Sequence, residues 1–478
     1  MTSTPSAPPG GPRPLRGHVT VFGRATLFIA VLLLSGLTWP AVGRARLVTY
    51  ADVRDVLATL SDILPPELEA GDPSKLETTW STWIEGHDRE IRARLERGDA
   101  DTIVNWLRFG TSFTARPRAL PETPAAEFPS LIAARAKDLW TALSMPAQDE
   151  RRLFTRTFFE RRGYRFSSPE DRSRLERHLV AEIGRVSVEQ AEHARELAAI
   201  RRLSDVSEQF ALRSRLFRDR GLSLDTSIVP GFALEQALQK IRTDGLITPS
   251  SIKRVAVVGP GLDFADKAAG YDFYPQQTLQ PFALIDTLLR LGLAEPAGVT
   301  ITTFDISPRV NDHLSRARAR ARSDAPYVLR LPLDPTVPWR PDLRGYWRRL
   351  GDRIGVELRA TMPAPEVKAL EVRTVRVRPA VALQVVPEDL DIVAQRFDGP
   401  PFDLIVATNI FVYYDTLDQS LALANVQAML RRGGLMLSNN ALLELPVLRM
   451  RSVGYMTVPY SQRPDDGDHI VWYQRLAD

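Results

Sequence analysis

The chain has 478 residues, of which 44% are apolar and 25% are charged, as in an ordinary globular protein of two or three domains. Its formal net charge of +4 is too small to indicate a nucleic-acid-binding protein. The absence of cysteine excludes disulfides and thiolate sites, and no two of the 6 histidines have the spacing of a zinc-binding helix, so no metal site is expected.

The N-terminal region combines a polar tail with one apolar segment. Residues 1–24 begin with many Pro, Ser, Gly and Thr residues, which predicts disorder. Residues 25–43 contain a charge-free stretch, ATLFIAVLLLSGLTWPAV. This stretch predicts a signal peptide cleaved near Gly43 or Ala45, or a transmembrane anchor, because its length is about the minimum for a bilayer. A misassigned start codon is the remaining explanation. We expect a membrane-associated or exported protein, and the arginines on both flanks leave the topology open.

Residues 46–224 are expected to form an all-α domain. The region is rich in Leu, Ala, Arg and Glu, and residues 188–203 carry apolar side chains at helical spacing. The stretch 101–114 is less regular, and it either lines a site or follows a helix that ends at Gly110. Its polar candidates are Asn105, Thr111, Ser112 and Thr114.

Residues 250–478 predict a doubly wound α/β domain, because runs of β-branched and other apolar residues alternate with helical segments. The expected strands are residues 255–258, 299–306, 402–409 and 434–439, with another within 370–390. The expected helices are residues 232–241, 281–293, 308–322 and 417–431. Two further strands, 453–460 and 469–475, flank a turn at Asp466-Gly467 and predict a closing antiparallel hairpin. The arginines of 308–322 spread around that helix, which favours a solvated surface.

Candidate ligand-binding residues follow several of the strands. Gly259 and Gly261 come directly after the first strand, where glycine lets a backbone approach a nucleotide-like ligand. Asp305 ends the second strand, where a carboxylate can bind both ribose hydroxyls. Thr408 and Asn409 end the next. Since the carboxyl ends of parallel strands form the ligand edge of such sheets, we expect these residues to lie together.

From about Val255 to Leu476 the sequence resembles the class I S-adenosylmethionine-dependent methyltransferases. VVGPGLD is similar to the family's glycine motif, TFDIS to its ribose-binding motif, and FDLIVATNIFVYYD with MLRRGGLMLSN to its fourth- and fifth-strand motifs. The resemblance implies a seven-stranded methyltransferase sheet and S-adenosylmethionine as the cofactor. It implies cofactor contacts by Gly259, Pro260, Gly261, Asp263, Asp305, Ile306, Asp389 and Asn409.

Within this resemblance, Asp389 would accept a hydrogen bond from the adenine amino group, with Glu388 as the second choice. Asn409, Tyr413 and Tyr414 would line the methyl-transfer side. The resemblance assigns no catalytic residue.

Two connections are long. Residues 263–280 are expected to cover the cofactor or the substrate, because loops at this edge of a sheet carry function. The candidates there are Asp263, Asp266, Lys267, Tyr271 and Tyr274. Residues 326–365 form an insertion near the substrate side. The insertion and the helical N-terminal domain are similar in plan to the chemotaxis-receptor methyltransferases, although Thr408 replaces the arginine of that family's fourth-strand motif.

The leading hypothesis is a membrane-associated S-adenosylmethionine-dependent methyltransferase of unknown acceptor. Methyl transfer from a sulfonium requires alignment more than acid–base groups, and no catalytic dyad stands out in the sequence. The expected partners are the methyl acceptor and, through residues 25–43, the membrane, with no nucleic acid.

Two alternatives stay open. An inactive methyltransferase-fold scaffold in the cell envelope is favoured by Val257, where the family has an acid, and by Asp263, where it has a third glycine. Export favours the same alternative, because S-adenosylmethionine is cytosolic. A nicotinamide-dependent oxidoreductase would share the glycines and Asp305, but the terminal hairpin argues against it.

Overall fold

The computed structural model describes residues 43–69, 73–120, 122–146, 149–200, 202, 212, 221–222, 227–264, 272–359, 370–463 and 466–477. The N-terminal tail and residues 25–42 of the apolar segment lie outside this set, and so do three loop candidates, Asp266, Lys267 and Tyr271. Among the described residues, no helix is long and apolar enough to cross a membrane. The residues from Gly43 onward belong to one unit.

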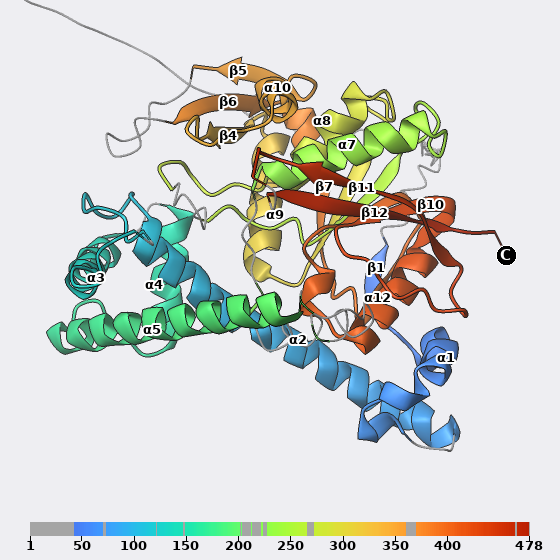
Figure 1. Ribbon diagram of the computed structural model, residues 1–478, viewed down its shortest axis with the longest axis horizontal. Helices are drawn as coiled ribbons and strands as arrows, with labels where there is room; N and C mark the ends of the chain where they lie inside the picture. Colours follow the sequence, from blue (N-terminus) through green and yellow to red (C-terminus); the bar gives the residue numbers. More distant parts are fainter. Residues whose placement is uncertain are drawn as a thin grey trace, which may run out of the picture. The chain divides into compact units, whose positions relative to one another are not determined.

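Seven strands form a central mixed sheet in the order β11-β12-β10-β9-β2-β3-β7. Figure 1 labels β7, β10, β11 and β12 of this sheet. The strands are β2 Arg254–Val258, β3 Thr300–Asp305, β7 Val385–Asp389, β9 Phe402–Ala407, β10 Leu430–Ser438, β11 Met450–Pro459 and β12 Gly467–Arg475. Neighbours from β7 to β10 are parallel, whereas β12 pairs antiparallel with both β10 and β11. This order, with its antiparallel penultimate position, is that of the class I methyltransferase sheet, so the predicted fold class and the closing hairpin are confirmed.

Alternate residues of β2 pack into two different cores. Val255 and Val257 belong to the core on one face, and Ala256 and Val258 to the core on the other. Both faces are therefore buried, which explains the uninterrupted apolar run. The first core includes residues of α7 Val229–Thr243, α8 Gln280–Arg290 and α9 Pro308–Arg322, and the second includes residues of α12 Thr416–Met429.

The N-terminal region is mostly helical, as expected. Its helices are α1 Tyr50–Thr59, α2 Pro73–Phe109, α3 Phe128–Ser144, α4 Glu150–Arg161 and α5 Pro169–Ile200, with short turns η1 Ser61–Ile63 and η2 Pro66–Leu68. The helix α2 is shared by two cores. Trp80 and Ile84 pack with the sheet, whereas Trp106 and Leu107 pack with α3, α4 and α5.

Two smaller sheets flank the central one. The strand β1 Arg44–Leu47 pairs antiparallel with β8 Gln395–Asp398. Between α9 and β7 the chain forms a three-stranded antiparallel sheet, with β4 Tyr327–Leu333, β5 Gly355–Leu358 and β6 Glu371–Val377 in the order β4-β6-β5. The helix α10 Pro341–Arg349 lies between β4 and β5 in the chain (Figure 1). The helix α11 Pro379–Leu383 leads into β7.

Candidate functional site

A cavity of about 360 Å³ lies at the carboxyl ends of β2, β3, β7 and β9. Its volume is within the range of roughly 300–1,000 Å³ found for small-molecule sites. Of the residues predicted to contact a cofactor, those that line it are Gly259, Gly261, Asp305, Ile306 and Asn409, and Thr408, Tyr413 and Tyr414 join them. The topology thus brings together residues that are up to 155 positions apart in the chain.

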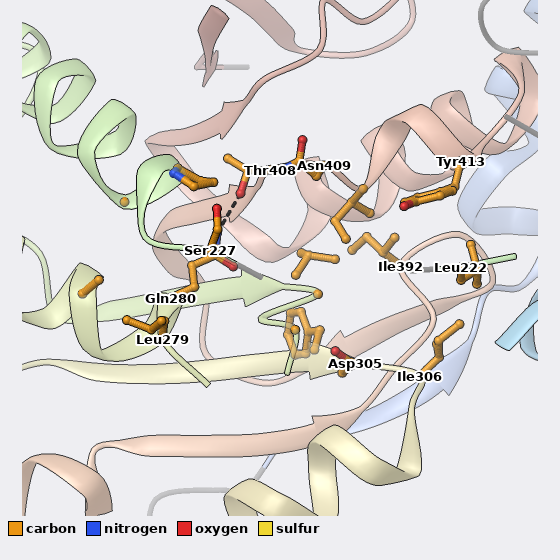
Figure 2. Close-up of a pocket in the computed structure, with 18 of the residues that line it drawn as sticks. Leu222, Ser227, Leu279, Gln280, Asp305, Ile306, Ile392, Thr408, Asn409 and Tyr413 are labelled. Carbon is orange, nitrogen blue, oxygen red and sulfur yellow. Dashed lines mark hydrogen bonds between the residues drawn. The ribbon is translucent and has the colours of Figure 1, made fainter. Parts of the chain in front are cut away.

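Figure 2 shows that the cavity has two distinct ends. Asp305, Ile306, Ile392, Tyr413 and Leu222 lie at one end, which we call the Asp305 end. Ser227, Leu279 and Gln280 lie at the other, the Gln280 end, and Thr408 and Asn409 are placed between the two.

The glycines after β2 have backbone conformations that other residues rarely adopt. The φ angles of Gly259 and Gly261 are +62° and +70°. A Cβ added to Gly259 would lie 2.2 Å from Cδ1 of Ile410, which also lines the cavity. Glycine is therefore required here both for the turn and for the close approach to the cavity wall.

Asp305 presents an unsatisfied carboxylate oxygen. Its Oδ1 accepts the N–H of Ser307 at 2.8 Å, while its buried Oδ2 has no hydrogen-bond partner. Burial raises the pKa of Asp305 to about 7 and the charge of Asp389 adds to this shift, although the backbone N–H groups of Ser307 and Gly261 oppose it. A buried acceptor without a donor is costly, so the residue is suited to a ligand that brings hydroxyl groups.

Apolar side chains form the rest of the Asp305 end. Leu390 and Ile392, which follow β7, line it, and so do Leu95 of α2 and Leu222. Such surfaces suit a planar base. The sequence analysis had predicted adenine contacts from Asp389 or Glu388 instead. The only sequence signal for Leu390 and Ile392 was their position after a strand.

The predicted adenine-binding residue lies outside the cavity lining. The side chain of Asp389 is 57% exposed, and its Oδ1 accepts a hydrogen bond from Nη1 of Arg92 at 2.7 Å. Glu388 and Pro260 are also absent from the residues that line the cavity.

The described residues that line the Gln280 end carry no charge. Gln280 Nε2 donates to Thr408 Oγ1 at 2.7 Å, and both side chains are buried (Figure 2). Gln280 is the first residue of α8, whose N-terminus has no side-chain cap. The described residues that line the cavity include no Lys or Arg. The positive end of the helix is therefore the feature that can receive an anion at this end.

Asn409 has an unusual backbone conformation at the exposed rim. Its φ is +60°, and its N–H donates to Asn439 Oδ1 at 2.7 Å. Asn439 Nδ2 donates back to Asn409 Oδ1. This reciprocal pair holds a non-glycine residue in the left-handed region, a kind of strain that clusters at functional sites. The sequence analysis did not single out Asn439 or Gln280, although Asn439 ends the quoted MLRRGGLMLSN segment and Gln280 ends the loop 263–280.

The loop candidates bind one another. Asp263 accepts hydrogen bonds from the Tyr274 hydroxyl at 2.7 Å and from Gln277 Nε2 at 3.0 Å, and it does not line the cavity. In the helical region, α2 ends before Gly110, and Thr111 and Ser112 bind the carboxylate of Asp272. They therefore fix the loop that follows β2.

Comparisons with known proteins found similar solved structures of low sequence identity. No protein-family model matches the sequence, and no curated protein matches it. Similar solved structures include the N-methyltransferase NodS from Bradyrhizobium japonicum in complex with S-adenosyl-L-homocysteine, at 12% identity over 60% of this chain and 98% of that one, with a TM-score of 0.25. The CcbJ methyltransferase from Streptomyces caelestis is 11% identical over 55% of this chain and 96% of that one, with a TM-score of 0.24. Magnesium protoporphyrin IX methyltransferase from Synechocystis, with bound S-adenosylmethionine, is 10% identical over 60% and 91%, with a TM-score of 0.23.

The order of the strands, with β12 antiparallel between β10 and β11, shows that the C-terminal half of this chain has the class I methyltransferase fold.

Proposed function

We propose that this protein is an S-adenosylmethionine-dependent methyltransferase of unknown acceptor. The observation that carries the proposal is the unpartnered Oδ2 of Asp305, in a cavity that also contains the Gly259–Gly261 turn. A ribose offers two hydroxyl donors to such a carboxylate.

The polar and apolar parts of the cavity match the ribose, adenine and methionine parts of S-adenosylmethionine. Asp305 would hold the ribose, and Ile306, Leu390 and Ile392 would contact the adenine ring. The uncapped N-terminus of α8 would receive the methionine carboxylate. The missing acid at Val257 does not weaken this arrangement, because the Val257 side chain is fully buried in the core and not in the cavity.

The cofactor would supply a methyl group on a positively charged sulfonium; an acceptor lone pair would form the new bond to the methyl carbon in line as the C–S bond breaks and its electron pair stays on sulfur. The protein's part is to align the acceptor and exclude water. Gln280 and Thr408 supply an amide and a hydroxyl that can orient an acceptor group. Burial raises the pKa of Tyr414 well above its ordinary value, so this hydroxyl stays protonated and does not act as a base.

Calorimetric titration of the full-length protein with S-adenosylmethionine and, separately, with NADH tests the proposal. We expect micromolar binding of S-adenosylmethionine and no binding of NADH. Asp305→Asn should bind S-adenosylmethionine at least tenfold more weakly with an unchanged circular dichroism spectrum, because a tenfold loss is about the free energy of one hydrogen bond to a charged group. A folded protein that binds neither ligand would instead support the inactive scaffold.

We also propose that residues 25–43 attach the protein to a membrane without being cleaved. Gly43 is buried against Phe397, where an added Cβ would lie 2.4 Å from a ring carbon, and β1 begins at Arg44. Cleavage at Ala45 would cut β1. Since the cofactor is cytosolic, the domain would face the cytoplasm. Membrane fractionation and the N-terminal sequence of the mature protein test this proposal, and a mature N-terminus at or after Gly43 would contradict it.

A further inference from the structure

The helix α2 touches most of the segments that form the Asp305 end of the cavity. It belongs to the N-terminal region, almost three hundred residues before Asp389 in the chain. Its residues between Arg92 and Gly98 hold these segments through side-chain bonds and one close backbone crossing.

Arg92 joins the segments that follow β3 and β7. Its Nη1 donates to Asp389 Oδ1 at 2.7 Å and lies 3.5 Å from the carbonyl oxygen of Ile306. Its Nη2 donates to Gln395 Oε1 at 3.1 Å, and the same oxygen accepts the N–H of Asp391. One guanidinium therefore holds the chain both before Leu390 and after Ile392, the two residues that line the cavity. Only a planar group with several donors can make these bonds at once.

Arg94 holds the segment that follows β9. Its Nη2 donates to the carbonyl oxygen of Tyr413 at 2.9 Å, and Tyr413 lines the Asp305 end. The next residue of the helix, Leu95, lines the cavity itself.

Gly98 lets a second segment cross the helix. A Cβ on Gly98 would lie 1.9 Å from the carbonyl oxygen of Leu222, and a Cβ on Gly221 would lie 2.5 Å from the nitrogen of Gly98. The N–H of Leu222 bonds to the carbonyl oxygen of Arg94 at 3.3 Å. Because both crossing residues are glycine, Leu222 reaches the cavity, where Figure 2 shows it beside Tyr413 and Ile392.

We infer that Leu95 of α2 and Leu222 form a wall of the site for the nucleoside part of the ligand, with Arg92 and Arg94 as positioning residues and the Gly98–Gly221 crossing as the element that places Leu222. The inference rests on the proposed function, since it assigns the Asp305 end to a nucleoside. It gives the N-terminal region a direct part in cofactor binding, in addition to any part in binding the acceptor.

Two ligands separate this role from a general structural one. S-Adenosylmethionine has both a nucleoside and an amino acid part, whereas 5′-methylthioadenosine has the nucleoside alone. We expect Arg92→Ala and Gly98→Ala to raise the dissociation constants of both ligands by the same factor, roughly tenfold or more, because a preorganised wall is lost. Gln280→Ala, at the opposite end, should weaken S-adenosylmethionine more than methylthioadenosine.

The same helix offers matched controls. Arg89 is exposed, and a Cβ on Gly86 would meet nothing closer than 3.9 Å. Arg89→Ala and Gly86→Ala should therefore leave both dissociation constants unchanged within about twofold. Arg92→Lys keeps the charge but cannot bridge Asp389 and Gln395 together, so we expect an intermediate affinity, and this variant replaces Arg92→Ala if the latter does not fold.

Calorimetry on the full-length variants decides between the outcomes. Equal weakening of both ligands in Arg92→Ala and Gly98→Ala, with unchanged controls, supports the inference. Wild-type affinity in both variants overturns it and leaves the proposed function standing. A folded wild-type protein that binds neither ligand overturns the proposed function and the inference with it.

Discussion

Trp106 donates its indole N–H to the carboxylate of Asp272 at 2.6 Å, and this contact ties the end of α2 to the loop that follows β2. The same carboxylate accepts the N–H and hydroxyl groups of Thr111 and Ser112 at distances between 2.6 and 3.0 Å. Burial alone would raise the pKa of Asp272, but the charge of Arg151 and these hydrogen bonds outweigh it and hold the pKa below its ordinary value.

Asp272→Ala should reduce the free energy of unfolding by about 3–5 kcal/mol at pH 7, because it leaves buried donors and the Arg151 charge unpaired. A lowered carboxyl pKa stabilises the folded state above the unfolded value of 3.8, and this stabilisation is lost as the pH falls through the folded value. The difference in free energy of unfolding between the wild type and Asp272→Ala should therefore shrink toward pH 3. Urea denaturation at several pH values measures this, with Asp55→Ala, which is 73% exposed, as the control. A constant difference at all pH values would contradict the assignment.

Asp305→Asn should stabilise the empty protein while weakening cofactor binding. Because the folded state raises the pKa of Asp305 to about 7, the folded protein binds this proton more tightly, and wild-type stability falls as the pH rises from about 4 to about 7. Asparagine removes this loss, which is at most about 4 kcal/mol for a shift of roughly three pKa units. Thermal unfolding from pH 5 to 8 should show a difference that grows with pH, and equal curves would contradict the raised pKa.

The same pKa predicts the pH dependence of binding. S-Adenosylmethionine should bind more weakly below pH 7, because protonated Asp305 loses acceptor capacity for the ribose hydroxyls. Calorimetry in buffers of different ionisation enthalpy should show net proton release on binding near pH 6.5. Binding without a change in protonation would show that Asp305 does not contact the ligand.

Gly259→Ala should abolish detectable cofactor binding. It should also lower the free energy of unfolding by more than the strain of placing alanine in the left-handed backbone region. The variant at Gly292 is a matched control, since its φ of +63° is nearly that of Gly259 at +62°, while a Cβ there meets nothing within 4 Å. Gly292→Ala should cost only the strain, about 1–2 kcal/mol. Gly259→Ala adds a clash with Ile410, which must then move into the cavity. Equal stability losses in the two variants would contradict the crowding at Gly259.

His87 makes the stability of the α2 contact depend on pH. Its Nε2 lies 2.6 Å from Asp418 Oδ1. Burial would lower the pKa of His87, but this hydrogen bond and the charges of Asp418, Asp391 and Asp415 outweigh it and raise the pKa. The pair therefore stabilises the fold fully below pH 6.5, and the stabilisation is lost as the pH rises through the raised value.

His87→Gln should consequently cost roughly 1–3 kcal/mol at pH 6 and much less at pH 9, as measured by urea denaturation. His178→Gln should behave in the opposite way. Burial lowers the pKa of His178, so its neutral replacement should raise stability on the acid side. A loss in His87→Gln that is independent of pH would show that the histidine is not charged in the folded protein.

Much of the sheet could be predicted from the chain because a strand buried on both faces needs a continuous apolar run. Val255 to Val258 is such a run, and the strand, the following glycines and Asp305 were all found from local patterns. The helix predicted at residues 308–322 coincides with α9, since Ser307 and Pro308 mark its start. The predicted end of the helix before β10 was less accurate. The α12 helix ends at Met429, and the strand begins before Gly433-Gly434.

The sequence by itself thus determined the strands of the central sheet, the glycine turn and the acid that ends β3, because each depends on residues adjacent in the chain. Only the tertiary structure decided which residues surround these groups. In the folded protein, Asp389 bonds to Arg92 and does not line the cavity, and Thr111 and Ser112 bond to Asp272. Leu95 and Leu222 line the Asp305 end. These contacts join segments more than eighty residues apart, and their partners follow from packing and the satisfaction of buried polar groups, which no local pattern encodes.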